Sequence, residues 1–489
     1  MRLSAQLTRQ PSLVHRLALA LVWLAVASSA IVFTEPAPTD VLTLGVIFVL
    51  PIIGLVAFPG PLLLITGLWL LVCGFGFLAA LAASDIGEAS KHMAISLYLA
   101  LASVAYAGFV IRKPRDHARL LLNAHLAGAL VAAILGLIGY FGLIPGASEL
   151  FTKFDRASGP FKDPNVFGPF IVPAVVYALH LWLGRSVLKS FWSALALAIL
   201  SLALLISFSR GAWGAAALAI VVYLYLRFVT SPRNLDRFRI VALGFAGALA
   251  LLVVAAAALQ IDSVERLFVE RAALTQTYDV GSEGRFGGQW KAAVLLSEMP
   301  FGIGALEFTR SHHHEDVHNV YLSMFLNAGW VGGILFLALM AGTLVLGARH
   351  ALRPTRTQGL FLVAYASLVG MVLLGAIIDT DHWRHLYLLA GLNWGLMIGD
   401  QRIARSVRIR ADRRHVLLHP VIVLPPTRRK ARILRPSAQV IDLAARRRRA
   451  RLPGTFSRPP RLIGPRRPSR PARIVAPLQL RALPGSAPK

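Results

Sequence analysis

Long apolar stretches alternate with short polar connectors along most of this chain. A hydrocarbon core about 30 Å thick is crossed by about 20 mostly apolar residues in a helix, and about twelve windows meet that criterion. They are 17–33, 41–58, 61–83, 92–111, 118–142, 166–184, 189–207, 211–228, 240–259, 319–346, 359–378 and 385–399. The pattern predicts an all-α, polytopic membrane protein of about 12 transmembrane helices.

The apolar run from Phe191 to Leu226 tests this count. As one helix rising 1.5 Å per residue it would be about 54 Å long, nearly twice the thickness of the bilayer core. Its single charge is Arg210, within Ser207-Phe-Ser-Arg-Gly211. The chain is therefore expected to fold back there, with Arg210 at the tip of a helical hairpin.

The connectors between the windows differ in charge. Basic connectors lie at 112–115, 185–189, 227–239 and 349–356, and acidic or neutral ones at 35–40, 85–88, 149–165, 260–317 and 379–381. Basic connectors stay in the cytoplasm, so both termini are expected there and the acidic connectors outside. The resulting plan has a cytoplasmic N-terminus (1–16), nine helices (17–259), a long outer loop (260–317), three helices (318–399) and a cytoplasmic tail (400–489).

Composition agrees with a membrane protein: 56% of the 489 residues are hydrophobic and 15% charged, against about 25% charged in soluble domains. The first apolar run could be a signal peptide, but a signal-anchor helix explains the same residues because further spans follow at once. Cys73 is the single cysteine, which excludes an intrachain disulfide and a cysteine-based metal site.

The net charge of +28 is concentrated in the tail, because 24 of the 51 Lys and Arg residues but two of the 23 acids follow Asp400. The tail is rich in Arg and Pro, which predicts a disordered segment attracted to anionic lipid headgroups. Nucleic-acid binding is not expected, since no stacking aromatics are interleaved with the arginines.

Candidate chemistry gathers in the polar stretch from Gln260 to His318. His318 and Asn319 stand at the mouth of the next helix, where an imidazole can activate a hydroxyl or simply hydrogen-bond the helix start. Arg285 opens an amphipathic segment with Trp290 that is expected to be helical up to Pro300. Its guanidinium can hold phosphate oxygens bidentately, or the segment can be an interfacial anchor. Arg210 offers the same phosphate chemistry.

Three consecutive histidines, His312 to His314, precede Glu315 and Asp316. Adjacent histidines on a regular element cannot all face one metal, although an irregular loop could bring them together. A solvated polar loop explains the run better, and replacing the three histidines together is expected to have a mild effect.

A second outward loop carries Lys162, Asp163 and Asn165. The Gly-Pro and Asp-Pro pairs around them are typical of turns, and Asn165 is placed to cap the next helix. The alternative is that these three residues bind a sugar or a phosphate.

Four separated segments resemble one family: FKDPNVFG at 161–168, SFSRGAWG at 207–214, the segment 284–304 and HNVYLSMFLNAGWVGG at 318–333. In this order, with a long loop before the His-Asn helix, they are similar to the O-antigen ligase and polymerase superfamily of bacterial envelope glycosyltransferases. The resemblance covers most of 17–399.

The resemblance implies a fold related to the GT-C glycosyltransferases in the bacterial inner membrane, active at its periplasmic face. Such enzymes transfer a glycan from undecaprenyl diphosphate to a hydroxyl of a growing polysaccharide or of lipid A core, with inversion and with no required metal or cofactor. On this chain, His318 matches the general base, and Arg210 and Arg285 match the arginines that hold the donor diphosphate. Asn319, Lys162, Asp163, Asn165 and Trp290 are expected to support the substrates.

Two other classes compete with this interpretation. A transporter or flippase of lipid-linked sugars would place ionisable groups or broken helices near the midplane, whereas the polar residues here gather at one face. A metal importer with a histidine loop is disfavoured by the scarcity of carboxylates in the spans. Polymerase and ligase are not distinguished by the sequence.

Overall fold

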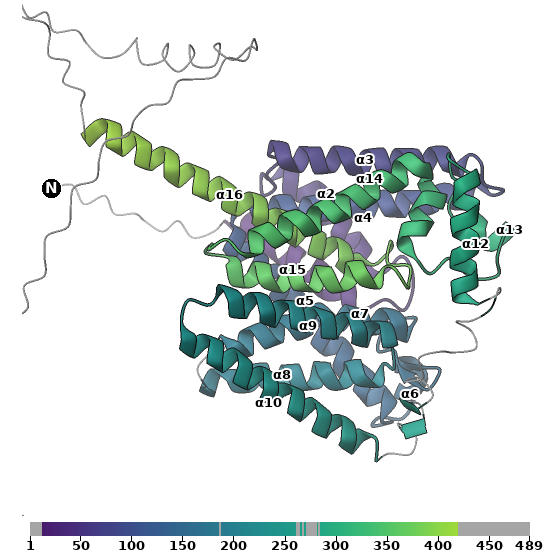
Figure 1. Ribbon diagram of the computed structural model, residues 1–489, viewed down its shortest axis with the longest axis horizontal. Coiled ribbons are helices and arrows are strands. Elements are labelled where there is room, and N and C mark those ends of the chain that lie inside the picture. Colours follow the sequence, from purple (N-terminus) through teal and green to yellow (C-terminus); the bar gives the residue numbers. More distant parts are fainter. Residues whose placement is uncertain are drawn as a thin grey trace, which may run out of the picture. The chain divides into compact units, whose positions relative to one another are not determined.

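A computed structural model of the chain describes residues 12–184, 187–260, 265–266, 268–269, 281 and 284–418. Its elements are α1 (Leu13–Ala27), η1 (Ser28–Ala30), α2 (Pro38–Ile52), α3 (Gly60–Ala80), α4 (Ile86–Arg112), α5 (Pro114–Tyr140), α6 (Ala147–Phe151), β1 (Thr152–Lys153), β2 (Arg156–Ala157), α7 (Pro164–Leu183), α8 (Val187–Ile206), α9 (Arg210–Thr230), α10 (Asn234–Ala258), α12 (Arg285–Glu298), α13 (Glu307–Ser311), α14 (Val320–Ala351), α15 (Gln358–Leu374) and α16 (Arg384–Leu418). The long helices run side by side, and α12, α13 and, apart from them, α6 lie at the same end of the bundle (Figure 1).

Each predicted apolar window overlaps a helix, although the helices at 38–52 and 358–374 end before the windows predicted for them. In the described part of the chain, eight helices are long and apolar enough to cross a membrane, and three further apolar helices are shorter (38–52, 190–206 and 358–374). The protein is therefore an all-α, multi-pass membrane protein. A total of twelve spans remains a prediction.

The turn expected at Arg210 is confirmed. Helix α8 ends at Ile206, and α9 begins at Arg210 after a tight turn in which Phe208 has a left-handed backbone (φ 47°). Ser209 caps α9, since its side chain accepts a hydrogen bond from the backbone N–H of Ala212. The hairpin thus forms where the lone charge interrupts the apolar run.

Connectors that were assigned to the same side of the membrane because they are acidic or neutral contact one another in the structure. Lys162 pairs with Glu35 across 3.4 Å, and Arg310 pairs with Asp85 across 3.2 Å. These contacts join the α5–α7 connection to the α1–α2 connection, and α13 to the α3–α4 connection. Connectors that are distant in the sequence therefore contact one another in two pairs.

Helix α14 is broken at Gly329, which has φ 66° and ψ −177°, a conformation that only glycine adopts without strain. The Pro-Phe-Gly-Ile-Gly turn at 300–304 fills the break. A Cβ on Gly329 would lie 2.8 Å from the carbonyl carbon of Phe301, and the N–H of Ile303 donates to the carbonyl of Leu326 at 2.8 Å. This turn ties α12 to the outer end of α14.

Helix α16 continues past the predicted boundary at 400 to Leu418. Asp400 is buried there, where its carboxylate lies 3.2 Å from Nε2 of His350 and accepts the hydroxyl of Thr357. Asp400 therefore belongs to the helical bundle. The tail predicted for 400–489 lies, from residue 419 on, outside the described residues.

Candidate functional site

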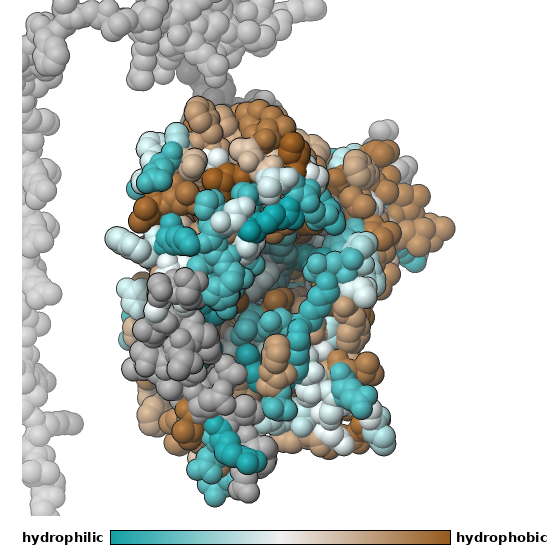
Figure 2. Space-filling model, turned by 90° about the vertical axis from the view of Figure 1, so that its right-hand side faces the viewer, coloured by the Kyte–Doolittle hydropathy of each residue, from teal (hydrophilic) through white to brown (hydrophobic). Residues whose placement is uncertain are grey.

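The end of the bundle formed by α6, α12, α13 and the outer connectors is hydrophilic. Figure 2 views this end and shows polar side chains around a hollow, with apolar residues gathered toward the sides. Apolar flanks face lipid in a membrane protein, whereas a polar, hollowed end faces water. A site for polar substrates is therefore most readily built here.

His318 lies at this end, directly before α14. Its Nδ1 is 3.3 Å from Oδ2 of Asp379, and its backbone N–H donates to the same oxygen at 3.1 Å. The hydroxyl of Ser323 donates to the other carboxylate oxygen at 3.1 Å. His318 has a left-handed backbone (φ 51°), which costs a non-glycine residue free energy and is often found at functional sites. One carboxylate thus hydrogen-bonds the backbone of this histidine and also lies beside its ring, although Nδ1 itself makes no hydrogen bond with the described residues.

The other ring nitrogen of His318, Nε2, lies 3.8 Å from Oε2 of Glu315, and the side chain is 26% exposed. The two ring nitrogens thus face different carboxylates, Nδ1 that of Asp379 and Nε2 that of Glu315. A neutral imidazole in this position can accept a proton from a substrate hydroxyl.

Asn319 is the N-cap of α14. Its side-chain oxygen accepts hydrogen bonds from the backbone N–H groups of Tyr321 at 3.1 Å and Leu322 at 3.2 Å. Such a cap satisfies the free amides of the first turn. Asn319 therefore fixes where the helix begins and, with it, the position of His318.

Helix α12 starts at Arg285, as the amphipathic pattern predicts, and lies against His318. Gln289 follows Arg285 by four residues, so the two share one face of the helix. Nε2 of Gln289 donates to the carbonyl oxygen of His318 at 3.0 Å. Arg285 thus occupies the helix face that contacts His318. Trp290 is 74% exposed on the outside of α12.

Arg210 reaches the same region from a different helix. It is the first residue of α9, and a Cβ on the adjacent Gly211 would lie 2.8 Å from Leu374 and 3.8 Å from Ile377. Leu374 ends α15, and Ile377 precedes Asp379 by two residues. The start of α9 therefore packs beside the connector that carries the carboxylate partner of His318.

The α5–α7 connection is organised by Arg156, which the sequence interpretation missed. Its side chain is 5% exposed, its Nε donates to the carbonyl of Ser207 at 2.8 Å, and its Nη2 donates to Oδ1 of Asn165 at 2.9 Å. The prediction that Asn165 caps α7 is wrong: Asp163 is the N-cap, and it accepts the N–H of Asn165 at 2.6 Å. An Asp before Pro in a turn could have been chosen as the cap from sequence.

The three consecutive histidines have different environments. His313 is 6% exposed, its ring stacks on Phe308 at 5.8 Å, and Gly288 of α12 lies against it, since a Cβ there would be 3.1 Å from the ring. His314 is more than half exposed and lies 3.9 Å from Glu315. His313 therefore supports α12, and the run does not act as one unit.

Acidic residues surround the His318 site. Partial loss of hydration raises the pKa of Asp316, and the negative charge of Asp379 raises it further. Burial also acts to raise the pKa of Asp381, but the charge of His382 and a hydrogen bond with His92 outweigh it and lower the pKa to about 2. Asp381 is therefore ionised at neutral pH.

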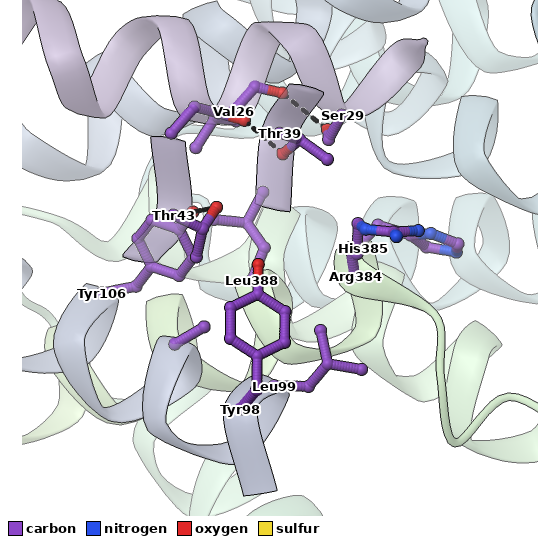
Figure 3. A pocket seen from close by; sticks show the side chains of 12 residues that line it. Val26, Ser29, Thr39, Thr43, Tyr98, Leu99, Tyr106, Arg384, His385 and Leu388 are labelled. Carbon is purple, nitrogen blue, oxygen red and sulfur yellow. Dashed lines mark hydrogen bonds between the residues drawn. The ribbon is translucent and has the colours of Figure 1, made fainter. Parts of the chain in front are cut away.

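A separate polar feature lies between α1, α2, α4 and α16. The hydroxyls of Thr39, Thr43 and Tyr106 line one side of a small cavity, and Arg384 lines another (Figure 3). Arg384 holds the carboxylate of Asp40 with two hydrogen bonds of 2.7 Å. The cavity of about 20 Å³ is the size of a water molecule, so this feature joins helices rather than binding a glycan.

Residues 194–337 match the family model described as O-antigen ligase. The matched segment begins in α8 and ends in α14, so it includes Arg210, Arg285 and His318. No curated protein matches the chain. The resemblance to the O-antigen ligase and polymerase superfamily is thereby confirmed over these residues.

Proposed function

We propose that this chain, a multi-pass membrane protein with O-antigen ligase-type activity, is an inverting glycosyltransferase that acts at the periplasmic face of the bacterial inner membrane. The donor is a glycan on undecaprenyl diphosphate, and the acceptor is a hydroxyl of a glycan or of lipid A core. The observation that carries this proposal is the pairing of His318, which lies within the matched segment, with Asp379, which follows it in the chain.

In the proposed reaction, Nε2 of His318 takes the proton from the acceptor hydroxyl. The acceptor oxygen then forms a bond to the anomeric carbon of the donor sugar from the side opposite the diphosphate. The bond from the anomeric carbon to the phosphate oxygen breaks, and the diphosphate leaves with its electron pair. Asp379 is a positioning residue, because its carboxylate orients the imidazole and stabilises the imidazolium that forms.

Arg210 and Arg285 are proposed to hold the diphosphate. Both are the first residues of helices, α9 and α12, where unsatisfied backbone N–H groups and the helix dipole also favour an anion. A guanidinium binds phosphate oxygens bidentately and keeps its charge throughout. These groups offset the negative charge that develops on the leaving group.

Asn165, Lys162, Asp163 and Trp290 remain proposed supports for the substrates. Asn165 is held by Arg156 close to the start of α9, and the exposed indole of Trp290 offers a surface on which a sugar ring can stack.

Purified protein in nanodiscs, supplied with an undecaprenyl diphosphate-linked oligosaccharide and candidate acceptors, tests the proposal. Wild type is expected to form a new glycosidic bond with inverted anomeric configuration, and His318→Ala to lose at least about 10²-fold of the rate. Ser297→Ala, on an exposed part of α12, is the control. Movement of the donor across the bilayer without bond formation would identify a flippase instead.

A further inference from the structure

A second cluster of ionisable residues lies at the outer end, beside the His318 site. His92 comes from the second turn of α4, and Asp381 and His382 come from the α15–α16 connection, almost three hundred residues later in the chain. One potential ligand atom from each of the three lies within 4.8 Å of the others. We propose that His92, Asp381 and His382 bind a divalent transition-metal ion of the zinc class.

The donor set is the reason for this choice of ion. Two imidazoles and one carboxylate suit zinc and related first-row ions, whereas magnesium and calcium prefer oxygen ligands alone. Three protein ligands leave a coordination position for water or a substrate group. The side chains of His92 and Asp381 are 16% and 9% exposed, so bulk water competes little for their donor atoms.

Hydrogen bonds from surrounding residues hold the proposed ligand side chains in place. Nε2 of His92 lies 3.2 Å from Oδ2 of Asp381, and the rings of His92 and His382 approach to 4.0 Å between centroids. Ser96, one turn after His92, hydrogen-bonds the ring of His382 at 3.0 Å. The hydroxyl of Tyr387 donates to the backbone carbonyl of Asp381 at 2.7 Å. Such surrounding hydrogen bonds hold ligand rings in position before an ion binds.

The consecutive histidines do not offer an equivalent site. His313 is buried under α12 and its Nδ1 accepts the N–H of Glu315 at 3.1 Å, whereas His314 is exposed. Among the described residues, the His92 cluster is the group of three whose ligand atoms converge. The segment with the most histidines in the sequence, 312–314, is therefore not the one whose ligand atoms converge.

The position of the cluster also gives the ion a role, which rests on the proposed function. Asp381 is two residues after Asp379, whose carboxylate contacts His318. An ion held by Asp381 and His382 would tie this short connector to α4. It would thereby fix the position of Asp379 without touching the diphosphate.

Metal binding is tested with full-length protein that carries no polyhistidine tag and has been stripped by a chelator. Titration with Zn²⁺, followed by calorimetry and elemental analysis, is expected to show about one tight site per chain. His92→Gln and Asp381→Asn are each expected to weaken that site by at least about tenfold. The double variant His312→Ala/His314→Ala is the matched control and should bind as wild type.

Cobalt supplies a second readout, because Co²⁺ held by nitrogen and oxygen ligands in a distorted tetrahedron absorbs visible light more strongly than hydrated Co²⁺. The absorbance is expected with wild type and not with Asp381→Asn, and thermal unfolding of each variant without metal shows whether it is folded. Absence of a tight site in wild type, or its loss in the His312/His314 variant alone, would overturn the proposal. His318→Ala should bind Zn²⁺ normally, so failed metal binding and failed glycan transfer are distinguishable.

Discussion

One carboxylate oxygen of Asp379, Oδ2, contacts His318 twice. It lies 3.3 Å from Nδ1 of the ring and accepts the backbone N–H at 3.1 Å. The two residues are 61 positions apart in the chain and come from opposite ends of the α14–α15 pair. Because a left-handed backbone at His318 is unfavourable by itself, the N–H contact helps to hold it. The pairing therefore holds the loop that carries His318 and places a carboxylate beside its ring.

The Asp379→Asn variant keeps a hydrogen-bond acceptor for the backbone of His318 but removes the negative charge of the carboxylate. The amide oxygen can still accept the N–H of His318, but the negative charge beside Nδ1 is lost. We expect kcat to fall at least about tenfold with little change in the KM for the acceptor. An unchanged kcat, or a loss of kcat/KM that comes from a higher KM alone, would contradict a positioning role for Asp379.

The proposed diphosphate site predicts that Arg285→Lys and Arg210→Lys both impair transfer, although each keeps a positive charge. A lysine ammonium cannot replace two parallel N–H···O bonds, so we expect at least about a tenfold loss of kcat/KM for the lipid-linked donor. Arg310→Lys is the matched control, because Arg310 forms an exposed ion pair with Asp85 and such pairs contribute at most about 1 kcal/mol. Equal loss in all three variants would argue against a specific donor site.

Of the three consecutive histidines, we predict that His313 contributes to the stability of the fold and that His312 and His314 can be replaced with little effect on it. His313→Ala removes a buried ring between Phe308 and α12, and we expect destabilisation of about 1–3 kcal/mol. His312→Ala and His314→Ala should be within about 0.5 kcal/mol of wild type, since surface changes usually are. Thermal unfolding in nanodiscs measures all three. A stable His313→Ala variant would show that α12 does not depend on this ring.

Gly329→Ala is expected to disrupt the outer half of α14. The added Cβ would lie 2.8 Å from the carbonyl carbon of Phe301, and alanine does not adopt the required backbone without strain of about 1–3 kcal/mol. Gly342→Ala, in the regular part of the same helix, has no atom within 4 Å of the new Cβ and is the matched control. Limited proteolysis of the 284–318 segment should distinguish them, with faster cleavage for Gly329→Ala alone. Equal cleavage rates would contradict the coupling of the turn at 300–304 to the break.

The sequence determined the helical plan. Because backbone N–H and C=O groups have no water to bind in lipid, each long apolar window must form a helix, and all the predicted windows did. Local chemistry was also sufficient for the turn before Arg210 and the start of α12 at Arg285. These features depend on residues within a few positions of one another.

Only the tertiary structure decided which distant residues meet. The pairing of His318 with Asp379, the support of Asn165 by Arg156 and the convergence of His92 with Asp381 all join different connectors. Helices surrounded by lipid are uniformly apolar, so the sequence has no strong periodic pattern that says which helix faces which. Charge predicts which connectors share one end of the bundle, whereas packing of the helices selects the side chains that lie within reach of each other.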